Sequence, residues 1–303
     1  MSKERRLSSL SVIIPAYNAE KFINISIESI LRQNVNIDEI IVVDDGSQDN
    51  TVSYIRDNYP MVKLIQQENG GPSKARNTGV KNATSEFISF LDADDEWCIN
   101  AVYIWKEVIE KNNEFNFFVG NYSVKNWINI VSRSDESRAI DSPIISFANG
   151  NLKIWTGAVC IKKNSFNNVG GFDENLRNGE DIDLWLRLLL AEKKIYCTTE
   201  VIAKYNFIND NSITSTFHRV DFRSREKLTF KYLEGNVILD SEERKYINIY
   251  FSNFYNSEFL SSLFIFDIKR AIKILSLKRK FKLNKPTIAS VYRLLRFQIL
   301  KKK

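Results

Sequence analysis

Cysteine and histidine are scarce in this 303-residue sequence, which has three cysteines without a CxxC pair and a single histidine. A disulfide framework or a structural zinc site needs several of these residues at short spacing. We therefore expect neither, and we expect a reducing compartment. No apolar run approaches the length of a membrane span, and residues 1–6 are charged where a signal peptide would be apolar. These absences predict a cytoplasmic protein.

The charges of the chain are unevenly distributed. The whole sequence carries +6, yet residues 219–303 contain 20 Lys and Arg against 8 Asp and Glu, a net charge of +12, which leaves −6 for residues 1–218. The hydrophobic and charged fractions, 44% and 26%, are those of an ordinary globular protein. We predict an acidic domain over 1–218 and a helical basic region over 219–303, each with its own kind of partner.

Strands alternate with helices in the first third of the chain. Apolar runs predict buried strands at 10–15, 39–43, 62–65 and 86–91, and helical spacing predicts helices over 19–32, 49–58 and 73–82. This order predicts an α/β fold with a mostly parallel sheet covered on both faces. Further on, we expect a helix over 97–111, strands within 116–131 and at 155–161, a polar loop over 132–143 and a helix over 182–191.

The strand predicted at 86–91 ends in three carboxylates, Asp92, Asp94 and Asp95. Ionised carboxylates repel one another, and a cation relieves that repulsion. Mg²⁺ and Mn²⁺ take oxygen ligands and typically join one or two carboxylates to substrate phosphates. Ligands of α/β folds lie at the carboxyl ends of parallel strands. The sequence therefore indicates a metal site here, with an acidic turn that caps the next helix as the alternative.

Five short motifs follow one another along the chain: VIIPAYN at 12–18, VVDDGS at 42–47, NGGPSKARNTG at 69–79, DAD at 92–94 and GEDIDLW at 179–185. Together they resemble family-2 glycosyltransferases of the GT-A fold, a Rossmann-like, mostly parallel sheet flanked by helices. The resemblance covers roughly residues 8–210 and leaves the tail outside. It implies transfer of a sugar from a nucleotide-sugar to a hydroxyl acceptor, with inversion at the anomeric carbon.

The resemblance also implies a set of nucleotide-sugar-binding residues. Tyr17 would lie against the base, although a tyrosine at a strand end is otherwise often core. Asp45 would accept a hydrogen bond from the uracil N–H, with a helix-capping Asp as the alternative. Arg76 would contact the nucleotide-sugar, and its alternative is a solvated surface arginine. The implied binding set is Pro15, Ala16, Tyr17, Asp45, Arg76, Asp92 and Ala93.

The DAD motif resembles the metal-binding DxD of the family. The resemblance implies that Asp94 binds Mn²⁺ or Mg²⁺ directly, and that Asp92 orients sugar or ribose hydroxyls beside the ion. Many relatives add a histidine after the last strand, but residues 205–212 contain none. Three possibilities stay open: His218 folds back to the metal, Asn209 or Asp210 replaces it, or no third protein ligand exists.

The Glu-Asp pair of the last motif would carry catalysis. In the resemblance Asp181 is the general base that takes the proton from the acceptor hydroxyl, and Glu180 orients the acceptor or supports Asp181. The alternative for both is a pair of helix N-terminal charges favoured by the dipole. Trp185 is either an acceptor platform or a core residue.

These observations predict an inverting enzyme that moves a hexose or N-acetylhexosamine from a UDP-sugar to a glycan hydroxyl. We expect the acceptor to be carried on a polyprenyl pyrophosphate and the product to be a bacterial surface polysaccharide. A nucleotidyltransferase and a catalytically inactive nucleotide-sugar-binding protein are the alternatives. The tail lacks the glycine- and aromatic-rich signatures of RNA modules, so no nucleic-acid partner is expected.

The tail combines apolar and basic residues at helical spacing. The apolar residues Ile268, Ala271, Ile272 and Leu275 alternate with basic ones, and 13 Lys and Arg follow Asp267 without any acidic residue. Basic amphipathic helices lie on anionic membrane surfaces, which predicts peripheral attachment to the inner face of the cell membrane through 268–303. The alternative is a helical bundle with a solvated basic face.

Overall fold

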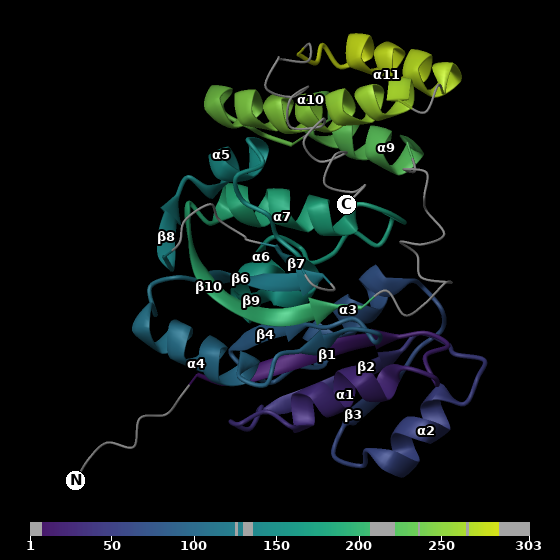
Figure 1. Cartoon of the computed structure of the whole chain (residues 1–303), viewed down its shortest axis with the longest axis vertical. Helices are drawn as coiled ribbons and strands as arrows, with labels where there is room; N and C mark the ends of the chain where they lie inside the picture. Colours follow the sequence, from purple (N-terminus) through teal and green to yellow (C-terminus); the bar gives the residue numbers. More distant parts are fainter. Residues whose placement is uncertain are drawn as a thin grey trace. The chain divides into compact units, whose positions relative to one another are not determined.

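The structure, a computed structural model, describes residues 8–124, 127–129, 136–206, 222–235, 237–264 and 267–284 (Figure 1). The chain divides into two compact units, one made of 1–143 with 153–220 and the other of 144–152 with 221–303. No sequence signal indicated that 144–152, which holds most of α5 (Pro143–Ala148), belongs with the C-terminal residues.

The first unit is built on a ten-stranded sheet, four strands of which form a parallel side. The parallel strands lie in the order β3 (Lys63–Gln66), β2 (Glu39–Asp44), β1 (Leu10–Ala16) and β4 (Phe87–Phe90). They are connected by α1 (Ile23–Leu31), α2 (Thr51–Asn58) and α3 (Pro72–Asn82). The predicted alternation of strands and helices is confirmed here, and β1, β2 and β4 are buried, largely apolar strands, whereas the edge strand β3 is partly exposed.

The other half of the sheet is mixed. Beyond β4 come β9 (Val159–Lys162), β6 (Phe117–Val124), β10 (Lys194–Tyr205) and β5 (Glu96–Trp97), with β7 (Trp127–Asn129) paired to β6 and β8 (Arg138–Asp141) paired to β10. In this half β6 and β10 are parallel, and β9 runs antiparallel to both β4 and β6.

Three local predictions in this half are wrong. The polar stretch expected to be a loop contains β8, which buries Ile140 against the sheet among exposed neighbours. The strand expected at 155–161 begins only at Val159, because residues 156–158 form a 3₁₀ turn. The helix expected from Trp97 is α4 (Ala101–Lys111), because Trp97 itself pairs with β10.

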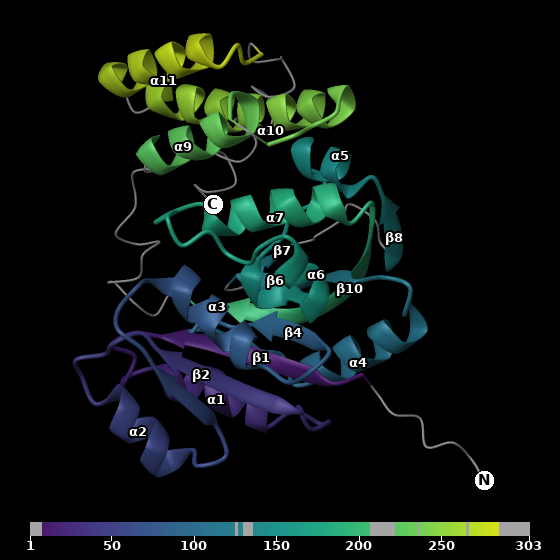
Figure 2. The same ribbon diagram turned by 180° about the vertical axis from the view of Figure 1, so that it is seen from behind.

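The two faces of the sheet are covered by different helices (Figures 1 and 2). On one face, Val12 and its neighbours pack in a single cluster with apolar residues of α1 and α4. On the other face α3 lies so close that a Cβ at Gly79 would be 2.3 Å from a methyl carbon of Ile13. The same face is covered by α6 (Lys163–Asn168) and α7 (Glu180–Ala191). There Trp185 is fully buried and stacks on Phe117, which confirms that it is a core residue.

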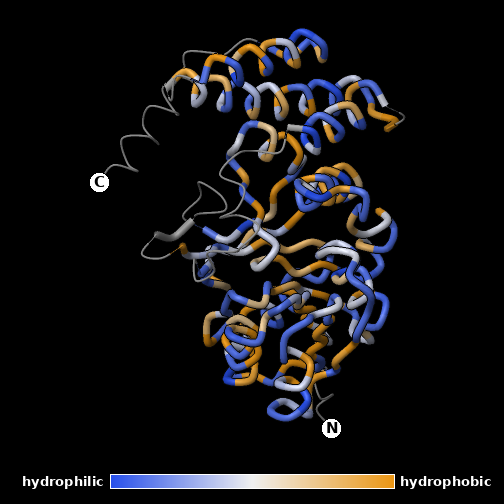
Figure 3. Tube along the Cα trace, turned by 90° about the vertical axis from the view of Figure 1, so that its right-hand side faces the viewer, coloured by the Kyte–Doolittle hydropathy of each residue, from blue (hydrophilic) through white to orange (hydrophobic). Residues whose placement is uncertain are grey.

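The second unit is helical, as predicted. Its helices are α9 (Phe222–Leu233), α10 (Ser241–Phe264) and α11 (Ile268–Lys280), together with most of α5. Its buried apolar residues include Leu228, Tyr232, Ile247, Phe251, Tyr255, Ala271, Ile274 and Leu277. Figure 3 shows polar and apolar residues alternating along these helices. No helix in the described part of the chain is both long and apolar enough to span a bilayer.

Glu39 joins the start of two parallel strands to the end of α3. Its Oε2 accepts hydrogen bonds from the Ser11 hydroxyl, 2.6 Å away, and from the Thr84 backbone N–H, 2.9 Å away. Burial by itself would raise the pKa of Glu39, but these hydrogen bonds and the charge of Lys63 outweigh it and lower the pKa. The carboxylate therefore favours the folded state when it is ionised.

Glu39→Gln should lower the free energy of unfolding of the first unit by about 1 kcal/mol at pH 7, because a charge-assisted acceptor is lost. The folded-state pKa lies below the ordinary value of 4.5. The contribution is therefore complete above about pH 4.5 and is lost as the pH falls through the folded-state pKa. Urea unfolding of both proteins between pH 7 and pH 3.5 checks this, and a pH-independent difference would contradict it.

Candidate active site

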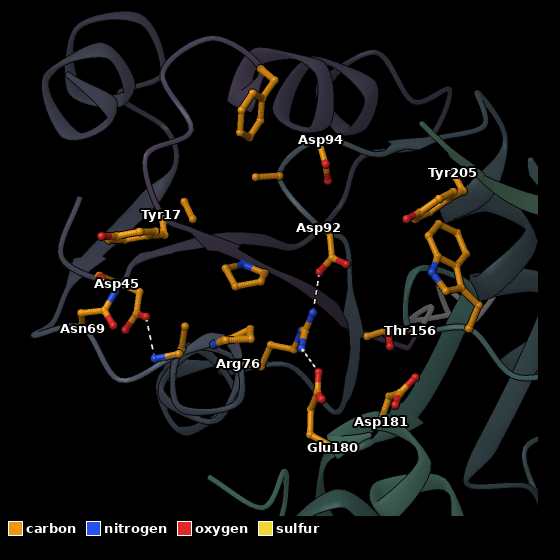
Figure 4. Close-up of a pocket in the computed structure, with 18 of the residues that line it drawn as sticks. Tyr17, Asp45, Asn69, Arg76, Asp92, Asp94, Thr156, Glu180, Asp181 and Tyr205 are labelled. Carbon is orange, nitrogen blue, oxygen red and sulfur yellow. Dashed lines mark hydrogen bonds and ion pairs between the residues drawn. The ribbon is translucent and has the colours of Figure 1, made fainter. Parts of the chain in front are cut away.

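A pocket of about 870 Å³ opens at the carboxyl ends of β1, β2 and β4 (Figure 4). Side chains that end neighbouring parallel strands converge there, as in other α/β folds. Every site residue predicted within the described ranges lines this pocket: Pro15, Ala16, Tyr17, Asp45, Arg76, Asp92, Ala93, Asp94, Glu180 and Asp181. His218, Asn209 and Asp210, the candidates for a third metal ligand, lie outside the described residues.

Tyr17, Asp45 and Asn69 form one end of the pocket (Figure 4). Tyr17 is 49% exposed, so the core alternative for it is wrong. The buried carboxylate of Asp45 accepts hydrogen bonds from the backbone N–H groups of Gly70 and Gly71, at 2.9 and 2.7 Å, and from a side-chain amide at 2.7 Å. Asp45 thus anchors the turn before α3 instead of capping a helix. A carboxylate has about four acceptor positions, and three are used here.

Arg76 occupies the middle of the pocket. It is 6% exposed, so the surface-arginine alternative is wrong. Its Nη2 donates to Asp92 Oδ1 at 2.6 Å, and its Nη1 lies 3.7 Å from Glu180 Oε1. The guanidinium carbon lies 5.3 Å from the centre of the Phe172 ring. Burial acts to lower the pKa of Arg76, but the charges of Asp92 and Glu180 raise it further. One cation therefore links α3, the DAD loop and α7.

The first turn of α7 carries Glu180 and Asp181. The helix begins after Gly179, whose φ of 80° is in the left-handed region that glycine adopts without strain. Two acidic residues there are favoured by the helix dipole, and both also face the pocket. Burial and the charge of Asp181 raise the pKa of Glu180, against the effect of Arg76. Asp181 Oδ1 accepts a hydrogen bond from the Ile182 N–H at 2.7 Å.

The position of α7 is held from its buried side. Arg187 donates through Nε to Asp183 Oδ2 at 2.9 Å and through Nη1 to the Val169 carbonyl oxygen at 2.5 Å. Asp183 is fully buried, so this pair is shielded from water. It attaches the helix that carries the two acids to the turn that follows α6.

Among the carboxylates of the site, Asp94 has the fewest neighbouring groups that would stabilise its negative charge. Burial and the nearby charge of Asp92 raise the pKa of Asp94 to about 6. No other residue in the described ranges donates a hydrogen bond to its carboxylate. Within the same ranges no three Asp, Glu, His or Cys residues gather into a metal cluster. The donor set therefore fits a hard cation that takes one or two carboxylates and completes its shell with ligand phosphates.

Asp95 has a role that the sequence did not indicate. It is fully buried, and its Oδ1 accepts from the Asn206 backbone N–H at 2.8 Å, while the Asn206 side chain donates to the Asp94 carbonyl oxygen at 3.2 Å. Burial, together with the charge of Asp92, raises the pKa of Asp95 to about 9. The third acid thus ties the DAD loop to the end of β10 through the two hydrogen bonds that Asn206 donates.

The comparison with protein families decides the classification. The model described as "Glycosyl transferase family 2" matches residues 11–175, more than half of the chain.

The chain belongs to glycosyl transferase family 2.

Several relatives and structures resemble this family-2 chain. The Escherichia coli protein "UDP-Glc:alpha-D-GlcNAc-diphosphoundecaprenol beta-1,3-glucosyltransferase WfgD" is 40% identical over 41% of this chain and 49% of its own length. The Bacillus subtilis "Minor teichoic acid biosynthesis protein GgaA" is 30% identical over 63% of this chain and 45% of its own length. The matched stretches thus span about half the length of these curated relatives.

The fold is shared with a solved structure. S. aureus TarS 1–349 in complex with UDP-GlcNAc superposes with a TM-score of 0.64 at 18% identity, covering 90% of this chain and 92% of that one. The predicted α/β fold of the GT-A type is therefore confirmed.

Arg76→Met should lower the free energy of unfolding by about 3 kcal/mol, because it leaves the acids beside it without a buried counter-charge. The matched control is Arg32→Met, which breaks an exposed ion pair to Glu96 and should cost less than about 1 kcal/mol. Urea unfolding of the two variants gives the comparison. An equal loss of unfolding free energy in the two variants would contradict the claim that Arg76 stabilises the site.

Proposed function

We propose that this chain is an inverting glycosyltransferase that moves a hexose or N-acetylhexosamine from a UDP-sugar to a hydroxyl of a lipid-linked glycan in cell-surface polysaccharide synthesis. The observation that carries the proposal is the composition of one pocket. A tyrosine and an aspartate lie at one end, the DAD carboxylates lie in the middle, and a Glu-Asp pair lies at the first turn of α7. Family membership favours this reaction over nucleotidyl transfer.

The donor is proposed to bind with its uracil at the Tyr17 end. The half-exposed ring of Tyr17 offers a stacking face, and the remaining acceptor position of Asp45 suits the uracil N–H. The names of WfgD and of the TarS complex, which contain UDP-Glc and UDP-GlcNAc, support a UDP-sugar donor. Pro15, Ala16 and Ala93 would line the ribose and sugar.

Asp94, with Asp92, would hold a Mn²⁺ or Mg²⁺ ion, whose chemistry is to neutralise charge on the departing diphosphate. The ion pair with Arg76 holds the carboxylate of Asp92 in position. Asp181 takes the proton of the attacking hydroxyl, and the oxygen forms its bond to the anomeric carbon as the bond to UDP breaks on the opposite face. Glu180, held near Arg76, orients the acceptor.

The test of the proposed function is UDP release from a panel of UDP-sugars, with UDP-glucose and UDP-GlcNAc first. Release of UDP together with free or transferred sugar is expected. Pyrophosphate as the product would indicate a nucleotidyltransferase. UDP-sugar binding without release, across the panel and with glycan acceptors added, would indicate an inactive binding protein.

Asp94→Ala should abolish the metal dependence of UDP binding and nearly abolish transfer, while the fold is retained, because only a crowded carboxylate is removed. Calorimetric titration of UDP with Mg²⁺ and with EDTA checks this, and Asp57→Ala on the exposed side of α2 is the control. Full activity of the native chain in excess EDTA would contradict the metal proposal.

Asp181→Asn should reduce turnover by about two to four orders of magnitude, the usual contribution of a general base. The affinity for UDP-sugar should stay close to that of the native protein, because Asn keeps the shape and the acceptor oxygen that faces Ile182. Turnover and donor affinity are measured side by side. A parallel loss of both would make Asp181 a binding residue instead.

Peripheral membrane attachment is proposed for α11, whose apolar residues fall on two stripes. Ala271, Ile274 and Leu277 are buried within the helical unit. On a second stripe Ile268, Ile272 and Leu275 are exposed by 67%, 62% and 42%. The flanking residues are mostly Lys and Arg, each contributing on the order of 1 kcal/mol at an anionic surface. The predicted continuation over 286–303 lies outside the described residues.

The triple variant Ile268→Ser, Ile272→Ser, Leu275→Ser should lose flotation with anionic liposomes, although its charge is unchanged. Ile238→Ser removes an apolar side chain that is 97% exposed in the segment before α10 and should float like the native chain. Equal flotation of the triple variant and the native chain, or no flotation of the native chain at low salt, would reject attachment through α11.

A further inference from the structure

Three aromatic side chains line the pocket and have no place in the motifs. We call Tyr122, Trp155 and Tyr205 the aromatic wall; they come from β6, from the residue before the 3₁₀ turn and from the end of β10. The ring centres of Tyr122 and Trp155 are 4.9 Å apart, and those of Trp155 and Tyr205 are 5.7 Å apart at 87°. The three rings therefore form one continuous apolar surface.

The aromatic wall is not part of the interior. Trp97, Trp105 and Trp185 are at most 1% exposed, whereas all three residues of the wall are only partly buried. Tyr122 and Trp155 pack with one side on the core cluster. Burial raises the pKa of Tyr122, and its hydroxyl finds no hydrogen-bond partner among the residues that the structure describes. The wall thus keeps free surface toward the pocket.

Gly157 allows the indole of Trp155 to lie close to the backbone. A Cβ at residue 157 would lie 2.5 Å from one ring carbon of Trp155 and 2.6 Å from the next. The indole can therefore lie against the backbone only because residue 157 is glycine. A ring fixed in this way loses little freedom when a ligand stacks on it.

The aromatic wall lies at the acceptor end of the pocket. Figure 4 shows Tyr205 on the side of Asp94 and Asp181, across the pocket from Tyr17 and Asp45. Thr156, adjacent to the wall, lies between Asp92 and Asp181. With the nucleoside at the Tyr17 end, as proposed, the diphosphate and donor sugar would extend toward the carboxylates, which would leave the wall for the group that attacks.

The charges of the pocket limit what this group can be. The charged side chains among the lining residues in the described ranges are five carboxylates and Arg76, which is already paired with Asp92. An anionic group placed beside Asp181 would be repelled unless a cation lay between the two. A neutral sugar fits, because its C–H face packs on aromatic rings and its hydroxyls can donate to Glu180, Asp181 and Thr156.

We propose that the aromatic wall is the acceptor subsite and that it binds the terminal neutral pyranose of the acceptor glycan. This inference rests on the proposed function, because it assigns the donor to the opposite end. The stacked ring presents a hydroxyl to Asp181, which takes the proton as the oxygen bonds to the anomeric carbon and UDP leaves.

Saturation-transfer NMR on the full chain with UDP and Mg²⁺ tests the assignment. The probes are methyl β-D-glucopyranoside, methyl β-D-galactopyranoside and methyl N-acetyl-β-D-glucosaminide. At least one probe should show saturation of its ring C–H protons. Trp155→Leu, which keeps apolar volume without a ring, should weaken its affinity about tenfold, and Trp155→Phe less than about threefold. Tyr103→Leu, an exposed aromatic on α4, is the control and should change nothing.

UDP affinity, measured by calorimetry on the same samples, separates the possible failures. It should be equal in all variants, and Tyr205→Leu provides a second variant should Trp155→Leu fail to fold. The inference would be overturned, without affecting the proposed function, by either of two results. The native protein could bind UDP but transfer no saturation to any probe, or the variants could bind the probe as tightly as the native chain. Loss of affinity for UDP-glucose in the Trp155 variants, measured in the same way while their UDP affinity is unchanged, would reassign the wall to the donor. Failure of the native chain to bind UDP would instead count against the proposed function.

Discussion

One buried guanidinium between two acids holds the site together. Arg76 on α3 bonds to Asp92 at 2.6 Å and lies 3.7 Å from Glu180, so it joins three segments that are far apart in the sequence. A buried charge without partners is costly, and each segment therefore depends on the others. Burial and the charge of Asp92 raise the pKa of Asp94 to about 6, and the proposed divalent cation would neutralise this carboxylate.

The same arrangement gives the pocket two chemically different ends. Asp45 bonds to Gly70 and Gly71 and so shapes a polar end beside Tyr17. The opposite end is aromatic and is held by the close approach of Trp155 to Gly157. The proposed donor, with its charged diphosphate, and the proposed acceptor, with a neutral ring, would use these two environments. The carboxylates between the ends are where the two substrates would meet.

The sequence predicted what depends on contiguous residues. The parallel strands, the carboxylates at their ends and the Glu-Asp pair of α7 are each readable from a few neighbouring positions. Contacts between residues that are far apart in the sequence could not be predicted from it. The structural role of Asp95 depends on its hydrogen bond from Asn206, and the aromatic wall joins residues from β6, from the position before the 3₁₀ turn and from β10. The strand β8 was missed because it buries a single apolar residue, Ile140, and its other contacts come from pairing with β10.

The most direct test of the account is the configuration of the sugar first released when the native chain hydrolyses UDP-α-glucose or UDP-α-GlcNAc without an acceptor. Proton NMR distinguishes the two anomers before they equilibrate. If Asp181 activates a nucleophile on the face opposite UDP, the β anomer appears first and the α anomer grows in only by mutarotation. Initial release of the α anomer would contradict a single displacement with Asp181 as the base.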